Sequence, residues 1–193
     1  MSNGVCVQLG LHNTAEFYLL TNYNWIDKID PNDFELKLIP KYFPDVISWS
    51  YYGVDYNPCS IARMIQKYPE RPKAHWICAA VLSYRKKLAS VAWDWDNNKN
   101  VWASAITLKE ILIFAGGSID ILKMDIEGAE IEIFQTYDFQ IKPKYLSISL
   151  HPAENKKERA HNGVHLSSIL EENGYKVFCR SDELTGILKD VPS

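Results

Sequence analysis

The sequence predicts an α/β protein with a mostly parallel seven-stranded sheet, a terminal antiparallel hairpin and helices on both faces. Apolar runs of strand length alternate with helical segments along most of the 193 residues, which is typical of right-handed βαβ units and parallel strands. The last two expected strands, 175–179 and 184–191, are joined by a short polar link, so they must be antiparallel neighbours. A chain of this length that is 47% hydrophobic suits a single domain over 1–193.

The N-terminal part contains three expected strands and two expected helices. The strands are runs of apolar or aromatic residues at 5–11, 46–55 and 75–82. Pro31 stands at the start of a helix over 31–43, although Pro40 disturbs its last turn. A second helix is expected over 58–68, with Asn57 as its cap and Pro58 at its first position. Residues 85–103 are ambiguous and fit a strand followed by the polar turn 96–100.

The C-terminal part continues the alternation up to the hairpin. The run T-L-K-E at 107–110 is a capping box, which places a helix between Thr107 and the glycine pair at 116–117. A strand at 119–126, a helix at 129–137, a strand at 145–151 and a helix at 164–173 follow in order. The hairpin then completes the sheet.

Composition excludes several classes of protein. A net charge of −3, with basic runs only at 85–87 and 156–157, argues against a protein that binds nucleic acid through its phosphates. The four cysteines lack zinc or C-x-x-C spacing, and Cys6, Cys78 and Cys179 are expected to be small core residues in a reducing compartment. The start resembles no signal peptide, and no apolar run approaches the roughly 20 residues of a membrane span. We expect a cytoplasmic protein.

The stretch ILKMDIEGAEIEIF at 121–134 begins as a buried strand, ends as a helix and carries charges through the junction. Within it, L-K-M-D-I-E-G-A-E resembles the K-x-D-x-E-G-A-E signature of FkbM-type S-adenosylmethionine (SAM)-dependent methyltransferases. Further segments agree in order, so that the resemblance covers about 51–151: Y-G-V-D-Y-N-P at 52–58, A-A-V at 79–81, T-L-K-E at 107–110 and S-I-S-L-H at 147–151. It implies the Rossmann-like class I methyltransferase fold. The first strand departs from the family pattern, because Gln8 stands in the acidic place and Gly10 is the only glycine of its turn.

The resemblance implies SAM as cofactor. Gly10, Asp55, Ala80 and Asp125 fall at carboxyl ends of expected strands, where open α/β sheets bind ligands. By the resemblance, Asp55 accepts hydrogen bonds from the ribose hydroxyls, and Tyr56 and Ala80 flank the adenine. An alternative for Asp55 is a turn residue ahead of Asn57-Pro58.

Asp125 and His151 are the candidate catalytic pair. Methyl transfer to a hydroxyl requires alignment of the acceptor and removal of its proton, and histidine can accept a proton near neutral pH. A divalent metal held by Asp125, Glu127 and His151 is a further hypothesis from spacing alone. His151 before Pro152 also fits a turn, and the two interpretations are equally open.

The other junction charges favour structural roles. Lys123 is expected to bury its stem and to pair with a carboxylate. Glu130 and Glu132 are expected to stabilise the positive end of a helix.

The acceptor is expected to be a hydroxyl on a sugar or small metabolite. Trp93, Trp95 and Trp102 could form a wall for such an acceptor, or could pack their loop onto the domain. His161 and His165 favour a helix start over a substrate contact. We expect no nucleic acid and no membrane as partners, and a homo-oligomer is conceivable.

A catalytically inactive binding module is the alternative function, suggested by the poor glycine turn at 8–13. A nicotinamide oxidoreductase is disfavoured because no G-x-G-x-x-G occurs.

Overall fold

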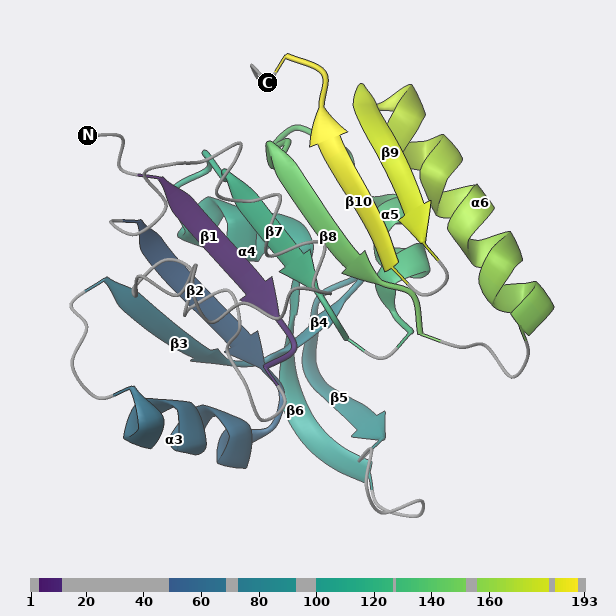
Figure 1. The fold of residues 1–193 in the computed structure, drawn as a ribbon. Helices are drawn as coiled ribbons and strands as arrows, with labels where there is room; N and C mark the ends of the chain where they lie inside the picture. The colour runs from purple at the N-terminus through teal and green to yellow at the C-terminus, as the bar shows by residue number, and fades with distance from the viewer. Residues whose placement is uncertain are drawn as a thin grey trace.

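The main sheet has seven strands in the order β3-β2-β1-β7-β8-β10-β9. The computed structural model describes residues 4–11, 49–68, 73–92, 100–126, 128–151, 156–180 and 183–190. Every pairing in this sheet is parallel except those of β10, which runs antiparallel to both β8 and β9 (Figure 1). The strands are β1 (Val5–Leu9), β2 (Ser50–Asp55), β3 (Ala74–Cys78), β7 (Ile121–Met124), β8 (Tyr145–Ser149), β9 (Tyr175–Arg180) and β10 (Glu183–Leu188). The predicted parallel sheet with a terminal antiparallel hairpin is confirmed.

A second sheet was not predicted. Its strands β4 (Ala80–Leu82), β5 (Lys86–Ala92) and β6 (Asn100–Thr107) lie in the order β4-β6-β5, and Figure 1 shows β5 and β6 extending beyond the ends of β1 and β2. The single strand expected at 75–82 is therefore wrong. The N–H of Ala79 still donates to the Asp55 carbonyl at 3.0 Å, but β2 ends there, and the chain turns to pair with β6 instead.

Four helices of the described residues cover the main sheet: α3 (Pro58–Lys67), α4 (Leu108–Phe114), α5 (Glu130–Thr136) and α6 (Lys156–Glu172). Both predicted caps are confirmed, since Asn57 accepts from the N–H of Cys59 and Thr107 forms a capping box with Glu110. The helix predicted at 164–173 begins earlier, at Lys156. Gly163 lies inside it, where an added Cβ would come within 3.2 Å of Leu150, so this glycine serves close packing rather than a break. The helix expected at 31–43 lies outside the described residues.

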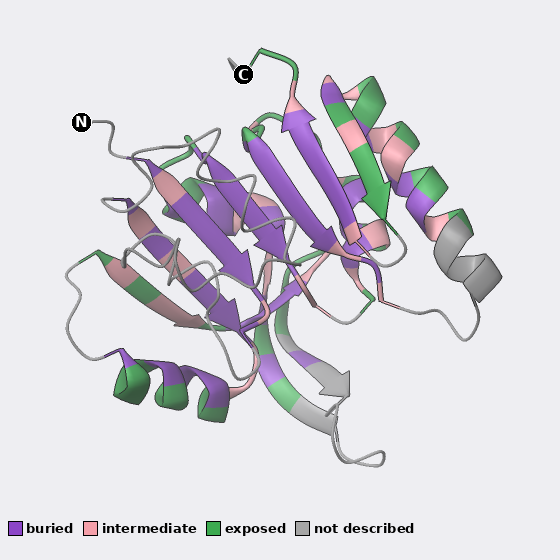
Figure 2. Ribbon diagram, in the orientation of Figure 1, coloured by how far each residue is buried: buried purple, intermediate pink, exposed green. Residues whose placement is uncertain are grey.

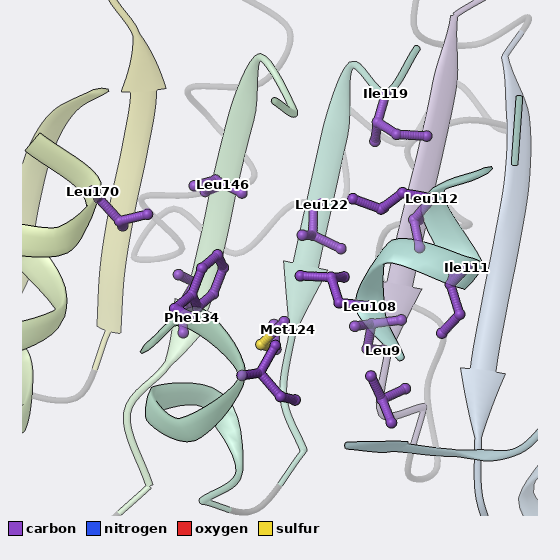
Figure 3. Close-up of a cluster of buried hydrophobic side chains, with 14 of the residues drawn as sticks. Leu9, Leu108, Ile111, Leu112, Ile119, Leu122, Met124, Phe134, Leu146 and Leu170 are labelled. Atoms are coloured by element: carbon purple, nitrogen blue, oxygen red, sulfur yellow. The ribbon is translucent and has the colours of Figure 1, made fainter. Parts of the chain in front are cut away.

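The core lies between the sheet and helices α4, α5 and α6. Alternate strand residues such as Leu9, Met124 and Leu146 meet Leu112 and Phe134 from the helices (Figure 3). The inner strands β1, β7, β8 and β10 are almost entirely buried, whereas the edge strands β3 and β9 are mostly not (Figure 2). Helix α3 packs on the opposite face of the sheet. At its C-terminal end the ring of Tyr68 stacks on that of Trp76 in β3, with the ring centroids 6.3 Å apart. Helices on both faces are thus confirmed.

Two of the three cysteines expected in the core are exposed. Cys6 is fully buried in β1, whereas Cys78 and Cys179 lie on the edge strands β3 and β9. Edge strands have one neighbour only, so an apolar sequence context there does not guarantee burial. No helix among the described residues is long and apolar enough to cross a membrane.

Candidate functional site

Gly10 joins the carboxyl ends of three neighbouring strands. Its N–H donates to the Val54 carbonyl at 2.8 Å, and the N–H of Asp125 donates to the Leu9 carbonyl at 2.9 Å. Gly10 has φ +81°, and an added Cβ would lie 1.7 Å from the carbonyl oxygen of Asp125. The glycine is therefore required by the contact between two strand ends, and its predicted role in binding the cofactor stays a prediction.

Asp55 is buried at the carboxyl end of β2, next to Gly10, with 7% of its surface exposed. One carboxylate oxygen accepts from the N–H of Leu11 at 3.0 Å, and the other accepts from the N–H of Asn57 at 2.7 Å. The bond from Asn57 supports the interpretation of Asp55 as a turn residue. The ribose interpretation of Asp55 stays a prediction.

Tyr56 and Ala80, which the resemblance places beside adenine, come together in the structure. Tyr56 packs against a cluster of small buried residues in the second sheet: Ala80, Ala89, Ala103 and Ala105. Ala80 begins β4, so it belongs to the second sheet and not to the third strand of the main one. The end of β2 and the second sheet therefore share this side of the site.

Asp125 and His151 are in direct contact. Nε2 of His151 lies 2.6 Å from Oδ1 of Asp125, and the two residues follow the neighbouring strands β7 and β8. Both are partly buried. A carboxylate in this position orients the imidazole ring.

Glu130 is buried at the start of α5 and interacts electrostatically with His151. Its Oε1 accepts from the N–H of Ile126 at 3.0 Å, which closes the turn after Asp125. Burial raises the pKa of the Glu130 carboxyl, while backbone hydrogen bonds and the nearby His151 oppose that rise. The predicted place in the first helical turn is confirmed, but the sequence did not indicate that Glu130 holds the loop.

Glu132 is exposed in the same helical turn, where it accepts from the Ser83 hydroxyl at 2.5 Å. Its predicted place near the helix start is confirmed.

Lys123 forms the structural pair that the sequence predicted. Its ammonium donates to Oε1 of Glu183 at 2.8 Å and to Oγ of Ser149 at 3.0 Å. Gln8, in the family's acidic place, is also buried, accepting from the Tyr51 hydroxyl at 2.8 Å. Sequence reasoning missed Ser149 and Glu183, and the only available signal was that a lysine inside a strand requires partners.

The proposed metal set is described only in part, because Glu127 lies outside the described residues. Among the residues that are described, no group of three or more His, Cys, Asp or Glu side chains could hold a metal ion. His161 and His165 lie within α6 and not at its start, which corrects that prediction, and the His165 ring is 2.9 Å from the Gln135 amide of α5. Trp102 is 67% exposed, while Trp93 and Trp95 lie outside the described residues.

The comparison with protein families decides what this chain is. The methyltransferase FkbM domain matches residues 26–177. The chain belongs to the FkbM methyltransferase family. The match confirms the resemblance found in the signature and extends it beyond 51–151 on both sides.

Solved structures similar to this FkbM family member are distant in sequence. A fibrillarin/Nop5p complex has 13% identity and a TM-score of 0.48, covering 95% of this chain and 71% of that chain. Methanococcus jannaschii fibrillarin has 12% identity and a TM-score of 0.47, with coverages of 97% and 67%. The N-methyltransferase NodS from Bradyrhizobium japonicum, in complex with S-adenosyl-L-homocysteine, has 11% identity and a TM-score of 0.45, with coverages of 95% and 76%. The comparison with curated proteins gives no match.

Proposed function

We propose that this FkbM family member is a SAM-dependent methyltransferase that acts on a hydroxyl of a sugar or small metabolite. The observation that carries the proposal is the contact of 2.6 Å between Asp125 and His151 at the sheet edge that also holds Gly10 and Asp55. Ligands of open α/β sheets bind at this edge.

The cofactor site is assigned to Gly10, Asp55, Tyr56, Ala80 and Asp125. SAM supplies a methyl group on a sulfonium sulfur. An ionised Asp55 carboxylate is an acceptor only, which fits the two donating hydroxyls of a ribose. Tyr56 and the small Ala80 offer an apolar side to a planar base.

His151 and Asp125 are assigned to the acceptor. A hydroxyl becomes a better nucleophile as its proton leaves, and His151 would take that proton. Asp125 would hold the imidazole in position through Nε2. In a second form of the proposal, Asp125 and His151, together with Glu127 outside the described residues, would hold a divalent metal, which would supply Lewis-acid activation of the acceptor hydroxyl.

A binding module without turnover is the second candidate. The observation that favours it is Gln8, which stands in the family's acidic place and uses its amide within the chain, toward Tyr51 and the Gly10 carbonyl.

The test is methyl transfer from SAM labelled in its methyl group to a panel of sugars, glycans and hydroxylated metabolites, after chelator treatment and again with Mg²⁺. We expect transfer by the natural chain and a loss of about 10²–10⁴-fold in His151→Gln, as for a general base. His75→Gln is the matched control, because His75 is an exposed histidine stacked on Tyr52, outside the assigned site. Normal SAM binding without transfer to any acceptor would refute the catalytic proposal and favour the binding module.

A further inference from the structure

Two contacts between side chains connect the carboxyl ends of β7 and β8, and they are consecutive along the two segments. Lys123 contacts Ser149 and Asp125 contacts His151, and in both pairs the partners are 26 residues apart in sequence. Residues two positions apart in extended chain project to the same face. Asp125 and His151 stand two positions after Lys123 and Ser149, just beyond the ends of β7 and β8, so the Lys123–Ser149 contact directly precedes the Asp125–His151 contact along both segments.

Lys123 is buried at a cost that its partners must offset. It is only 5% exposed and lies in one row across the sheet with three other buried polar residues, Gln8, Ser147 and Thr185. An ammonium group buried in this way destabilises the fold unless a carboxylate and further acceptors surround it. Glu183 of β10 supplies the carboxylate at 2.8 Å, so that a single lysine connects β7, β8 and β10.

We propose that Lys123 is a positioning residue for the candidate catalytic pair. Its ammonium holds Ser149, and with it the end of β8, at the offset that keeps Nε2 of His151 on Oδ1 of Asp125. Lys123 itself touches neither cofactor nor acceptor in this proposal. The consequence for catalysis rests on the proposed function, whereas the consequence for the His151–Asp125 contact does not.

An ion pair at the amino ends of β7 and β8 supplies a matched control. Lys144, just before β8, pairs with Asp120, just before β7, at 2.6 Å. This pair also joins a lysine to a carboxylate between the two strands, but its lysine side chain is 48% exposed and lies at the opposite edge of the sheet. Both Lys123→Met and Lys144→Met remove an ion pair, but only Lys123 lies close to His151. The comparison therefore separates loss of an ion pair in general from loss of the contact beside His151.

The experiment compares the natural chain with Lys123→Met, Lys144→Met and Ser149→Ala. The ring ¹⁵N shifts of His151, read by NMR at one fixed pH, report the contact with Asp125 without any acceptor. Calorimetry measures the SAM Kd, and kcat and KM are measured with the acceptor that the screen identifies. Thermal unfolding confirms that each variant is folded.

We expect Lys123→Met to shift the His151 ring signals and to lower kcat by about 10–100-fold, because small misplacement of catalytic groups has effects of that size. The SAM Kd should change by less than about threefold, and Lys144→Met should leave the ring signals and kcat unchanged. Ser149→Ala retains the Lys123–Glu183 pair and should shift the His151 signals with a smaller loss of kcat.

Unchanged His151 signals in Lys123→Met, or an equal shift in Lys144→Met, would overturn the proposal. If Lys123→Met does not fold, Ser149→Ala decides: shifted ring signals support the positioning role, and unshifted signals refute it. Failure of the natural chain to transfer methyl groups would refute the proposed function instead, and the NMR comparison would still be decisive for Lys123.

Discussion

Replacing Gly10 by alanine should destabilise the fold far more than the same change at another glycine of positive φ. Gly10 has φ +81°, and its added Cβ would lie 1.7 Å from the Asp125 carbonyl oxygen. A left-handed backbone conformation costs an L-residue roughly 1–2 kcal/mol. Gly116, with φ +104° and nothing within 4 Å of an added Cβ, should show that conformational cost alone.

The contact with Asp125 adds a second cost at Gly10. The obstructing atom is backbone, so relief requires the ends of β1 and β7 to separate. Overpacking typically costs about 1–3 kcal/mol. Separation also weakens the bonds from Gly10 to Val54 and from Asp125 to Leu9, each contributing about 0.5–1.5 kcal/mol. We therefore expect Gly10→Ala to lower the free energy of unfolding by about 3–6 kcal/mol, against about 1–2 kcal/mol for Gly116→Ala.

Urea unfolding followed by intrinsic fluorescence measures both values from the transition midpoint and slope. The slope should be unchanged in Gly116→Ala. A difference between the two variants of less than about 0.5 kcal/mol would refute the close contact of the two strand ends, since that is the size of effect expected for an unconstrained site.

Two further predictions concern buried side chains, one beside the site and one in the hydrophobic core. Burial raises the pKa of Glu130 above its ordinary 4.5, so the folded state binds this proton more tightly than the unfolded state. The contribution of Glu130 to the free energy of unfolding should therefore be fully present below pH 4.5 and be lost as pH rises through the folded pKa. Glu130→Gln should remove this pH-dependent loss of stability. Chemical unfolding of the natural chain and the variant at several pH values measures it, and an equal dependence of the free energy of unfolding on pH in both proteins would contradict the prediction. Leu112→Ala, in the core of Figure 3, should cost about 2–5 kcal/mol. Ile113→Ala next to it, at a residue that is 57% exposed, should cost less than about 1 kcal/mol, and similar losses in thermal stability for both would contradict the assigned helix face.

The parallel sheet could be predicted because it depends on local alternation of strands and helices. The second sheet could not, because the run at 75–82 is continuously apolar through Ala79. The break there arises from the end of β2 at Asp55, which is a matter of strand pairing and not of local composition. The length of α6 was underestimated as well: the helix continues through Gly163, where an added Cβ would come within 3.2 Å of Leu150, and that packing contact is not visible in the sequence.

The candidate site could be predicted as a set of residue types but not as a set of contacts. The signature indicated Asp125, and the end of β8 indicated His151, but their direct contact depends on strand offset. Lys123 illustrates the same limit, because a buried lysine predicts some carboxylate partner, while the choice of Glu183 follows from the position of β10. For Gly10 the close approach of the Asp125 carbonyl could not be read from the sequence, and its role at the cofactor stays a prediction.

Calorimetric titration with SAM, comparing Asp55→Asn with Asp120→Asn, tests the assigned cofactor site. The two aspartates are each 7% exposed and each accepts a backbone N–H at one end of β1, from Leu11 and from Val5 respectively. Hydrogen bonds to a charged acceptor contribute about 1.5–3 kcal/mol, so Asp55→Asn should raise the SAM Kd at least about tenfold. Asp120→Asn, at the opposite edge of the sheet, should leave the Kd unchanged. Equal affinities in the natural chain and both variants, or no SAM binding by the natural chain, would contradict the assignment.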